Sequence, residues 1–301
     1  METKKIRVAV VGYGNIGKHA KEAVLAASDM ELAGIVRRDG AKNQQGDCLF
    51  IDEKTDIAAL GRVDVALLCK PTRQIEEYAI GYLSQGIHTV DSFDIHNGIA
   101  DLRRRLGDAA KKGGSVAIVA AGWDPGSDSV VRALLEAAAP VGITYTNFGP
   151  GMSMGHSVVA RSKAGVADAL SLTIPLGTGV HRRMVYVQLE EGADIDTVTQ
   201  AIKSDDYFCH DETYVIPVPD VSALADMGHG VHMTRKGRSG SSDNQLFTFE
   251  MRIHNPALTA QVMVSCARAA MRRQPGAYTI IELPLIDLLP GERENIINRL
   301  V

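Results

Sequence analysis

A glycine-rich turn near the amino terminus constrains the fold of this chain more than any other stretch. The segment VVGYGNIG places Gly12, Gly14 and Gly17 in the spacing G-x-G-x-x-G, after a strand-like run and before a helix-like run. In that setting the first glycine permits a tight turn, the second lets the backbone approach a pyrophosphate, and the third lets the helix pack close to the sheet. We interpret the segment as a dinucleotide-binding turn with the phosphates at the helix N-terminus, and not as a purely structural turn.

The residues up to about Ala121 alternate short β-branched runs with helix-like runs, as parallel βαβ units require. The expected strands are Ile6 to Val11, Glu31 to Arg37, Val63 to Cys69, Ile87 to Asp91 and Ser115 to Ala120. The expected crossover helices are Gly17 to Ala27, Thr72 to Gln85 and Asp94 to Lys112. The pattern predicts an α/β fold with a doubly wound, Rossmann-type parallel sheet, whose ligands gather at the C-terminal ends of the strands.

The pattern changes after Trp123, where longer strand-like segments are joined by turns and two short helices. These segments, 169–174, 184–189, 214–218 and 245–253, predict a second, open α+β sheet. A helix is then expected with Asn255 as N-cap, Pro256 at its first position and Gly276 beyond its end. The expected domains are a dinucleotide-binding domain at 1–122, a second domain at 123–254, and a segment at 255–301 that packs back on the first domain.

Charge and composition disfavour several classes of function. A net charge of -4 over 301 residues gives no long-range field for phosphate backbones or anionic lipids, so neither nucleic acid nor a membrane is an expected partner. No apolar run reaches the roughly 18 residues that cross a bilayer, and no signal core precedes the first strand. The cysteines lack C-x-x-C spacing, and His229 with His232 lacks a third ligand. We therefore expect reduced thiols, a cytoplasmic location and no metal site.

The end of the second expected strand indicates which dinucleotide binds. An NAD site usually carries an acid there to hold the ribose 2′-hydroxyl, whereas this chain has Arg37 and Arg38. Guanidinium groups pair with a 2′-phosphate through charge-assisted hydrogen bonds, which favours NADP. In the alternative interpretation both arginines end a strand in water and Asp39 contacts the ribose.

Polar residues follow three of the expected strands, in the segments CKPT, DSFD and WDP. The ends of neighbouring parallel strands meet at one edge of a sheet, so Asp94 and Asp124 are expected near the nicotinamide. A carboxylate at that place holds an ammonium group and helps to move its proton. The alternative role for each is a helix cap, with Asp94 before a helix from Ile95 and Asp124 before the helix that follows Pro125.

The second domain contains polar residues within or beside apolar strands. Arg183 has the geometry to grip a carboxylate with two hydrogen bonds, and Thr173 and His229 add donors. Asn255 is a further polar residue of this kind. Each of them alone is more simply a surface residue or a hydrogen-bonded core residue, so the set indicates a binding site only if its members converge.

Stretches along the whole chain resemble the meso-diaminopimelate D-dehydrogenases. They are VAVVGYGNIGK, TVDSFDIH, AGWDPGSDSV, NFGPGMSMGH, HDET and NPALT, followed by the C-terminal AYTIIELPLIDLLPGE. GWDPG followed by FGPGMSMGH is specific to the family, whereas the glycine turn is not. The resemblance implies NADP-dependent oxidative deamination at the D-centre of meso-2,6-diaminopimelate. The products are ammonia and L-2-amino-6-oxopimelate, which cyclises to tetrahydrodipicolinate, and the reverse reductive amination serves lysine and diaminopimelate biosynthesis.

The resemblance also implies roles for individual residues. Asp94 and Asp124 lie at the D-end, where either one serves as the base. The residues that contact substrate are Trp123, Phe148, Met154, Gly155, Thr173, Arg183, His229 and Asn255. Of these, Trp123 and Phe148 shape the pocket, Met154 and Gly155 offer backbone to the D-carboxylate, and the last four read the distal L-end. The residues that contact NADP are Gly12, Tyr13, Gly14, Asn15, Ile16, Arg37, Arg38, Cys69, Lys70, Pro71, Thr72, Ser92, Phe93 and Asp94. Likeness to the family further suggests a homodimer built through the second domain.

Three alternatives remain open from the sequence. The short segment between Thr173 and Arg183 resembles a branch of the family that accepts simpler 2-oxo acids, so a D-amino acid dehydrogenase of broader range is one of them. A sugar oxidoreductase of the glucose-fructose type is the second, but Cys69-Lys70-Pro71 mimics its E-K-P motif one strand too early. A non-catalytic NADP sensor is the third, although it would have little use for Asp124 and Arg183 together.

Overall fold

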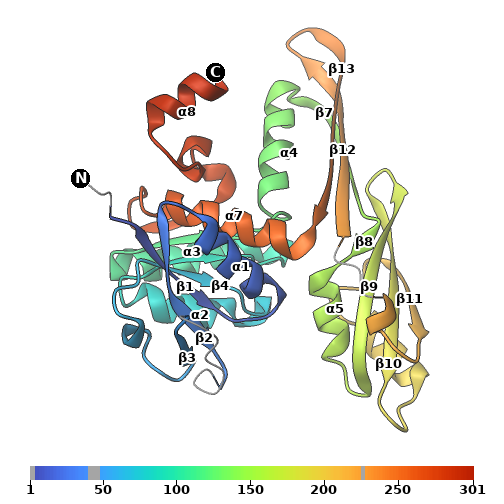
Figure 1. Ribbon diagram of the computed structural model, residues 1–301. Helices are drawn as coiled ribbons and strands as arrows, with labels where there is room; N and C mark the ends of the chain where they lie inside the picture. The colour runs from blue at the N-terminus through green and yellow to red at the C-terminus, as the bar shows by residue number, and fades with distance from the viewer. Residues whose placement is uncertain (1–3, 40–47, 225–227) are drawn as a thin grey trace. The chain divides into compact units, whose positions relative to one another are not determined.

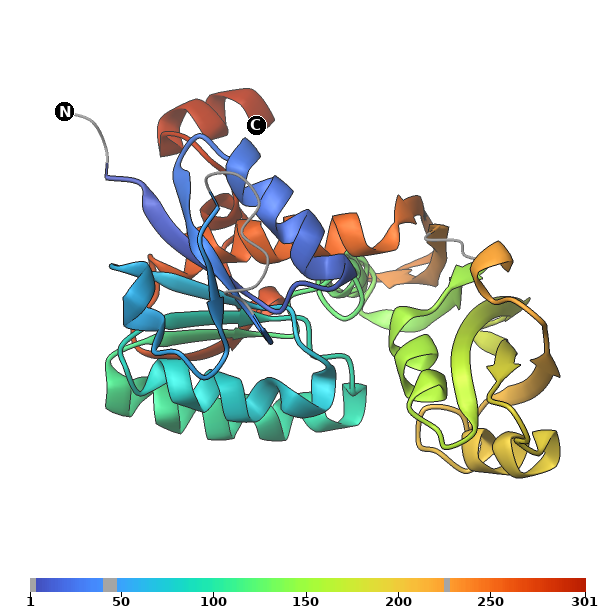
Figure 2. The same ribbon diagram turned by 60° about the horizontal axis from the view of Figure 1, so that its bottom comes forward.

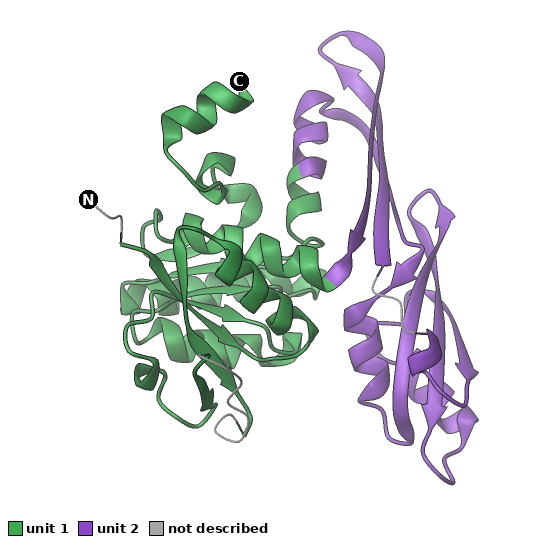
Figure 3. Cartoon of the chain, viewed as in Figure 1, with its two compact units in different colours: residues 1–130, 256–301 green, residues 131–255 purple. Residues whose placement is uncertain are grey.

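The computed structural model describes residues 4–39, 48–224 and 228–301. The chain divides into two compact units, one of Met1–Val130 with Pro256–Val301 and one of Val131–Asn255 (Figure 3). It leaves the first unit within α4 (Ser127–Ala138), a few residues beyond the boundary expected from the sequence. The C-terminal segment returns to the first unit.

In its described residues the first unit contains one seven-stranded sheet in the order β14-β6-β5-β4-β1-β2-β3, with every neighbouring pair parallel (Figure 1). This is the doubly wound order of Rossmann folds, with one strand added beside β6. The strands are β1 (Ile6–Val11), β2 (Met30–Arg37), β3 (Phe50–Asp52), β4 (Val65–Leu68), β5 (His88–Asp91), β6 (Val116–Val119) and β14 (Gly276–Thr279). The predicted strands are confirmed to within about two residues, but β3 and β14 were not predicted. β3 has only three residues and shows no period of its own, and β14 comes from the distant C-terminal segment.

Two layers of helices cover this sheet. α1 (Asn15–Ala26) and α7 (Asn255–Ala270) pack against one face, and α2 (Ile75–Leu83) and α3 (Ile99–Gly113) against the other (Figure 2). Successive residues of β1 alternate between the two layers, because side chains of a strand point to opposite faces. Full burial of a leucine such as Leu83 or Leu106 contributes about 1.5–3 kcal/mol.

The third expected helix begins later than the sequence predicted. α3 starts at Ile99 after a short 3-10 turn at His96–Gly98, and its N-cap is Gly98 with no side-chain hydrogen bond. The interpretation of Asp94 as the cap of a helix from Ile95 is therefore wrong. Its carboxylate instead accepts a hydrogen bond from Thr72, as described below.

The second unit contains two sheets in its described residues, where one open sheet was expected. A four-stranded sheet has the order β11-β10-β9-β8, and a three-stranded antiparallel sheet the order β13-β12-β7. The strands are β7 (Val141–Phe148), β8 (Gly151–Met152), β9 (Val166–Gly177), β10 (Val180–Leu189), β11 (Glu212–Pro217), β12 (Gly228–Ser239) and β13 (Ser242–His254). β7, β8 and β12 were missed, since β8 has two residues and the glycines and charges of β12 conceal its alternation. α5 (Met154–Arg161) and α6 (Ile195–Lys203) pack on the four-stranded sheet.

Ion pairs attach the C-terminal segment to the first unit. Arg268 of α7 binds both oxygens of Asp29 at 2.6 and 2.8 Å, and Arg103 binds Glu282 at 2.7 Å. Within the segment itself, buried Asp287 binds Arg272 and Arg273. Gly276 opens β14 and does not cap α7, which ends at Ala270. The chain then ends in α8 (Arg293–Leu300). No helix in the described part of the chain is long and apolar enough to span a membrane.

Candidate active site

The glycine turn between β1 and α1 has the geometry that the sequence indicated. Gly12 has φ +97°, and a Cβ added there would lie 2.3 Å from the carbonyl oxygen of Cys69. A Cβ on Gly17 would lie 2.1 Å from the oxygen of Gly12, so turn, strand and helix are in close contact. Around Gly14 nothing lies within 4 Å of such a Cβ, and Gly14 caps α1 without a side-chain hydrogen bond. The turn therefore leaves space beside the N–H groups of the first helical turn, where an anion binds best.

Two arginines end β2 beside this turn. Arg38 is exposed, and Arg37 is half-buried with its Nε donating to the oxygen of Arg38 at 3.4 Å. Asp39 has φ +55°, and its backbone N–H donates to Asp52 at 2.8 Å. Residues 40–47, which follow in the sequence, lie outside the described residues.

The segment after β4 is tied to the sheet by a buried ion pair. Lys70 Nζ lies 2.5 Å from Glu53 Oε2 and 3.1 Å from the hydroxyl of Tyr78, and only 9% of its side chain is exposed. The hydrogen bond from Lys70 lowers the pKa of Glu53. Because the ammonium of Lys70 is engaged in these contacts, we expect Lys70 to contact a cofactor through its backbone atoms. Burial raises the pKa of the Cys69 thiol to about 12, so this thiol is neutral at pH 7.

Both candidate catalytic aspartates lie at this edge of the first unit. Asp94 Oδ1 accepts a hydrogen bond of 2.5 Å from the hydroxyl of Thr72. Asp124 Oδ2 lies 3.9 Å from Nε2 of His96, and 13% of the Asp124 side chain is exposed. Trp123, beside Asp124, is buried. Carboxylates thus follow both β5 and β6, and each suits a cation.

A third carboxylate here, Asp91, had no predicted role. It ends β5, is 0% exposed, and its Oδ1 accepts hydrogen bonds from the backbone N–H of Phe93 at 2.9 Å and of Ala120 at 3.0 Å. Burial raises the pKa of Asp91 to about 6, although both hydrogen bonds oppose the shift. An acidic residue at the end of a buried strand was the signal that would have found it.

In the second unit the candidate substrate residues converge around β8. Thr173 of β9 lies opposite both Arg183 of β10 and Gly151 of β8. A Cβ on Gly151 would lie 2.8 Å from Cα of His229, so the strand runs against His229 as well. Asn255 donates a hydrogen bond of 3.2 Å to the oxygen of Met152. Residues far apart in sequence therefore meet at one two-residue strand.

Arg183 is oriented from two sides. Its Nε donates to Asp211 Oδ2 at 2.6 Å and its Nη1 donates to the hydroxyl of buried Thr173. These bonds use two of the five N–H groups of the guanidinium, so three on Nη1 and Nη2 remain for a ligand. The neighbouring Arg182 pairs with exposed Glu212 at 2.9 Å on the other face of β10. Only Arg183 therefore points into the convergent group.

Residues after β8 lead into α5, whose first turn contains Met154 and Gly155. Its N-cap, Ser153, makes no side-chain capping bond, so backbone N–H groups at this end suit a carboxylate. The ring of His156 packs edge-on against Tyr207 and Phe208 at 5.2 and 5.1 Å. Burial, with a contribution from Arg183, lowers the pKa of His156 to about 3, so its ring is neutral. No role for His156 was predicted from the sequence.

Phe148, at the end of β7, lies against His181. The ring centroids are 5.5 Å apart, and the Phe148 N–H donates to Nε2 of His181 at 2.8 Å. This bond fixes where the Phe148 ring stands in the second unit.

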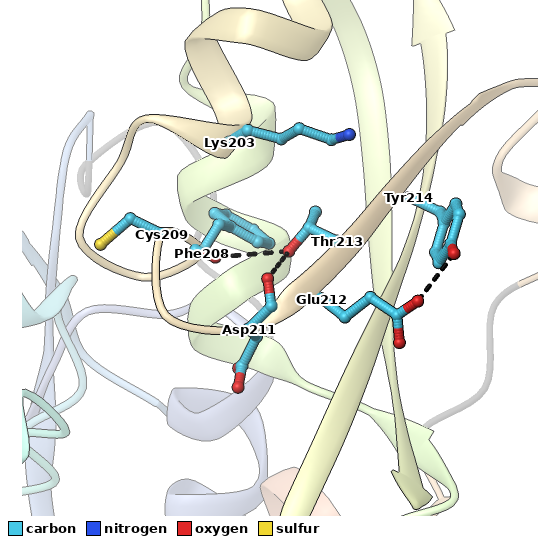
Figure 4. A pocket seen from close by; sticks show the side chains of 7 residues that line it. All are labelled: Lys203, Phe208, Cys209, Asp211, Glu212, Thr213 and Tyr214. Atoms are coloured by element: carbon cyan, nitrogen blue, oxygen red, sulfur yellow. Dashed lines mark hydrogen bonds between the residues drawn. The ribbon is translucent and has the colours of Figure 1, made fainter.

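The start of β11 borders a pocket of about 380 Å³ that the sequence did not indicate (Figure 4). The residues that line it are Lys203, Phe208, Cys209, Asp211, Glu212, Thr213 and Tyr214. Asp211 thus contributes both to this pocket and to the orientation of Arg183. Among the described residues no group of three His, Cys, Asp or Glu side chains has the arrangement of a metal site.

Comparison with known proteins yields matches in both units. A family model described as the diaminopimelic acid dehydrogenase C-terminal domain matches residues 122–255, and one for an oxidoreductase family with an NAD-binding Rossmann fold matches residues 6–91. Meso-diaminopimelate D-dehydrogenase of Bacteroides fragilis is 61% identical over 298 residues, covering 99% of this chain and 100% of the relative. The enzyme of the same name from Lysinibacillus sphaericus is 34% identical, over 95% of this chain and 96% of its own.

Two solved structures are similar over nearly the whole chain. A diaminopimelate dehydrogenase of C. glutamicum in complex with DAP has a TM-score of 0.88 at 30% identity, covering 99% of this chain and 100% of that one. An engineered D-amino acid dehydrogenase bound to NADP+ has a TM-score of 0.87 at 29% identity, with the same coverage of 99% and 100%.

Proposed function

The chain belongs to the meso-diaminopimelate D-dehydrogenase family, and from this premise we propose that it oxidatively deaminates the D-centre of meso-2,6-diaminopimelate with NADP. Loss of the hydride to NADP gives an imine, which water hydrolyses, so the products are L-2-amino-6-oxopimelate, ammonia and NADPH. The reverse reaction is a reductive amination. The observation that carries the proposal is the presence of two groups of charged and polar side chains, one in each unit. One unit presents Asp94 and Asp124 at the edge of a dinucleotide sheet, and the other presents Arg183 with Thr173, His229 and Asn255 around β8.

The charges of the substrate match these two groups. Diaminopimelate has two ammonium and two carboxylate groups, and burying any of them without a partner is costly. Asp94 and Asp124 suit the ammonium at the D-carbon. The N–H groups of Arg183 that remain suit the distal carboxylate, and the first turn of α5 suits the carboxylate at the D-carbon.

The residues of the first unit fit NADP. The space around Gly14 and the N–H groups that open α1 suit the pyrophosphate, and Arg37 and Arg38 suit a 2′-phosphate. When bound there, NADP would supply the acceptor for the hydride of the D-carbon. The chain positions that carbon by holding both ends of the substrate, so that only the D-centre reaches the ring.

We assign the movement of the amine proton to Asp124. His96 lies 3.9 Å from its carboxylate, and 61% of the His96 side chain is exposed, which gives the proton a route to solvent. Asp94 accepts a hydrogen bond from Thr72, which fixes its carboxylate for holding the ammonium. We therefore expect Asp124→Asn to lose the pH dependence of kcat and Asp94→Asn to retain it.

The proposed activity is tested with purified protein, NADP and meso-diaminopimelate. We expect NADPH and ammonia to appear in equal amounts. NADP binding measured by fluorescence without any NADPH formation would instead favour a non-catalytic sensor.

We also propose a cellular setting. The reverse reaction supplies diaminopimelate for lysine synthesis, the reduced and scattered cysteines suit the cytoplasm, and the chain forms a homodimer through its second unit. Separation of the protein by size, with mass measured by light scattering, tests the dimer directly.

A further inference from the structure

One carboxylate in the core of the first unit contacts both loops that carry the candidate catalytic aspartates. Asp91 Oδ1 accepts from the N–H of Phe93, the residue before Asp94, and from the N–H of Ala120, four residues before Asp124. The carbonyl oxygen of Asp91 also accepts from Ala121 at 2.6 Å. A single residue therefore makes three bonds to the two loops.

The two loops also run close to each other, and one of them has an unusual backbone conformation at Ala120. A Cβ on Gly122 would lie 3.5 Å from Cβ of Ser92, in ordinary contact. Ala120 has φ +55°, a left-handed conformation that residues with a Cβ rarely adopt without support. The N–H of this same residue donates to Asp91. The bond thus fixes the backbone where it turns toward Trp123 and Asp124.

The stability of the core does not explain why a carboxylate is present at the buried position of Asp91. The side chain is 0% exposed, and Oδ2 has no hydrogen-bond partner among the residues that the structure describes. Burial, with a smaller contribution from the Asp91 carboxylate, raises the pKa of the Cys266 thiol in α7. An ionised group in such surroundings costs stability, and an apolar residue of similar size would normally be preferred.

Thr89 provides a comparison on the same strand. It lies two residues before Asp91, so both side chains point to the same face of β5, and it too is 0% exposed. Its hydroxyl has no hydrogen-bond partner within the described part of the chain. Thr89 therefore shares the strand, the face and the burial of Asp91 but contacts neither loop through its side chain.

We propose that Asp91 is a positioning residue for the dehydrogenase reaction, because its one oxygen fixes the loops of Asp94 and Asp124 in register with each other. This inference rests on the function proposed above. Asp91 does not touch substrate or cofactor in this role. It sets the distance between the carboxylate that holds the ammonium and the carboxylate that moves its proton.

The test compares Asp91→Ala, Asp91→Asn and Thr89→Val in the full-length enzyme, with kcat expressed per NADPH-binding site. Misplacement of reacting groups by an ångström lowers rates on the order of 10²-fold, so we expect such a loss in Asp91→Ala while the Kd for NADPH stays within about threefold. Asp91→Asn keeps an oxygen for both N–H groups and should restore kcat to within about threefold, with a Tm no lower than that of the wild type. Thr89→Val should match the wild type.

Several results would overturn the proposal. They are an unchanged kcat in Asp91→Ala, a parallel loss of NADPH binding that marks a general structural role, or an Asp91→Asn variant as slow as Asp91→Ala. If Asp91→Ala does not fold, Asp91→Ser replaces it, because its shorter side chain still cannot reach both N–H groups. Failure of the proposed function is distinguishable, since then the wild type and Thr89→Val also produce no NADPH from meso-diaminopimelate.

Discussion

At the scale of single residues, the chain orients its key groups through partners that lie far away in sequence. Arg183 is held by Thr173 and Asp211, and Asp94 by Thr72. The residue types were predictable from their place beside apolar strands, but these partners were not. Parallel pairing of β10 with β11 brings Asp211 to Arg183, and sequence spacing does not contain that register.

Replacing Asp211 by Asn tests the orientation of Arg183. Loss of one charge-assisted hydrogen bond costs about 1.5–3 kcal/mol, so we expect KM for meso-diaminopimelate to rise by about 10-fold or more with kcat little changed. Glu212→Gln is the matched control, because Glu212 is the next residue and pairs with exposed Arg182. Equal changes in KM for both variants would contradict the role of Asp211.

The neutral ring of His156 predicts how stability depends on pH. Its pKa is about 3 in the folded chain and higher when unfolded, so the unfolded state binds the additional proton as the pH falls below about 6.5. Stability from this residue is therefore present at pH 7 and is lost progressively toward pH 3.

Urea denaturation at pH 7 and pH 5 measures this loss. For a fully buried ring, the free energy of unfolding would fall by about 2 kcal/mol between pH 7 and pH 5. Because His156 is partly exposed, we expect a fall of about 1 kcal/mol. Over the same pH interval, the free energy of unfolding of His156→Gln should fall by about 1 kcal/mol less than that of the wild type. An identical loss in both proteins would show that His156 is protonated in the folded state.

At the scale of elements, short segments contribute more to the candidate site than long ones do. β8 has two residues, yet it joins Thr173, His229 and Asn255 and leads into the first turn of α5. The turn from β1 to α1 is equally short and was predictable, because only glycine satisfies its close approaches. β8 was not predictable, because two residues are too few to show a hydrophobic period. Its role comes from the strands that pair with it.

Substitution by alanine should have different effects at two glycines of the β1–α1 turn. Gly14→Ala places a methyl group in open space, so the fold should be retained while affinity for NADP falls by about 10-fold or more, as the methyl blocks the pyrophosphate. Gly17→Ala places it 2.1 Å from the oxygen of Gly12, so the Tm should fall instead. Thermal unfolding with and without NADP separates the two. A stable Gly14→Ala variant with unchanged NADP affinity would contradict this placement of the phosphates.

At the scale of the whole molecule, the sequence predicted the two-part organisation but not all of its parts. Strands β1 to β6, apart from β3, follow from alternating apolar runs, and the family resemblance spans both units. β14 was missed because four residues from the C-terminal segment complete a sheet that begins at Ile6. The second unit was expected as one sheet and has two, because strand pairing over long sequence separations is not encoded locally.

Asp94 and Asp124 of the first unit suit an ammonium group, Arg183 of the second suits a carboxylate, and diaminopimelate has both kinds of group. The D-centre supplies the hydrogen that is transferred, and the L-end supplies the groups that Arg183 and its neighbours bind. A substrate that has only one of these features should therefore fail at the step that needs the other.

The most direct measurement is the initial rate of NADPH formation with the meso, LL and DD isomers of diaminopimelate at equal concentration. We expect the meso isomer to react, the LL isomer to give no NADPH because it has no D-centre, and the DD isomer to react only with a much higher KM. Comparable rates with the LL and meso isomers would contradict the central claim that the D-centre is selected by holding the distal L-end.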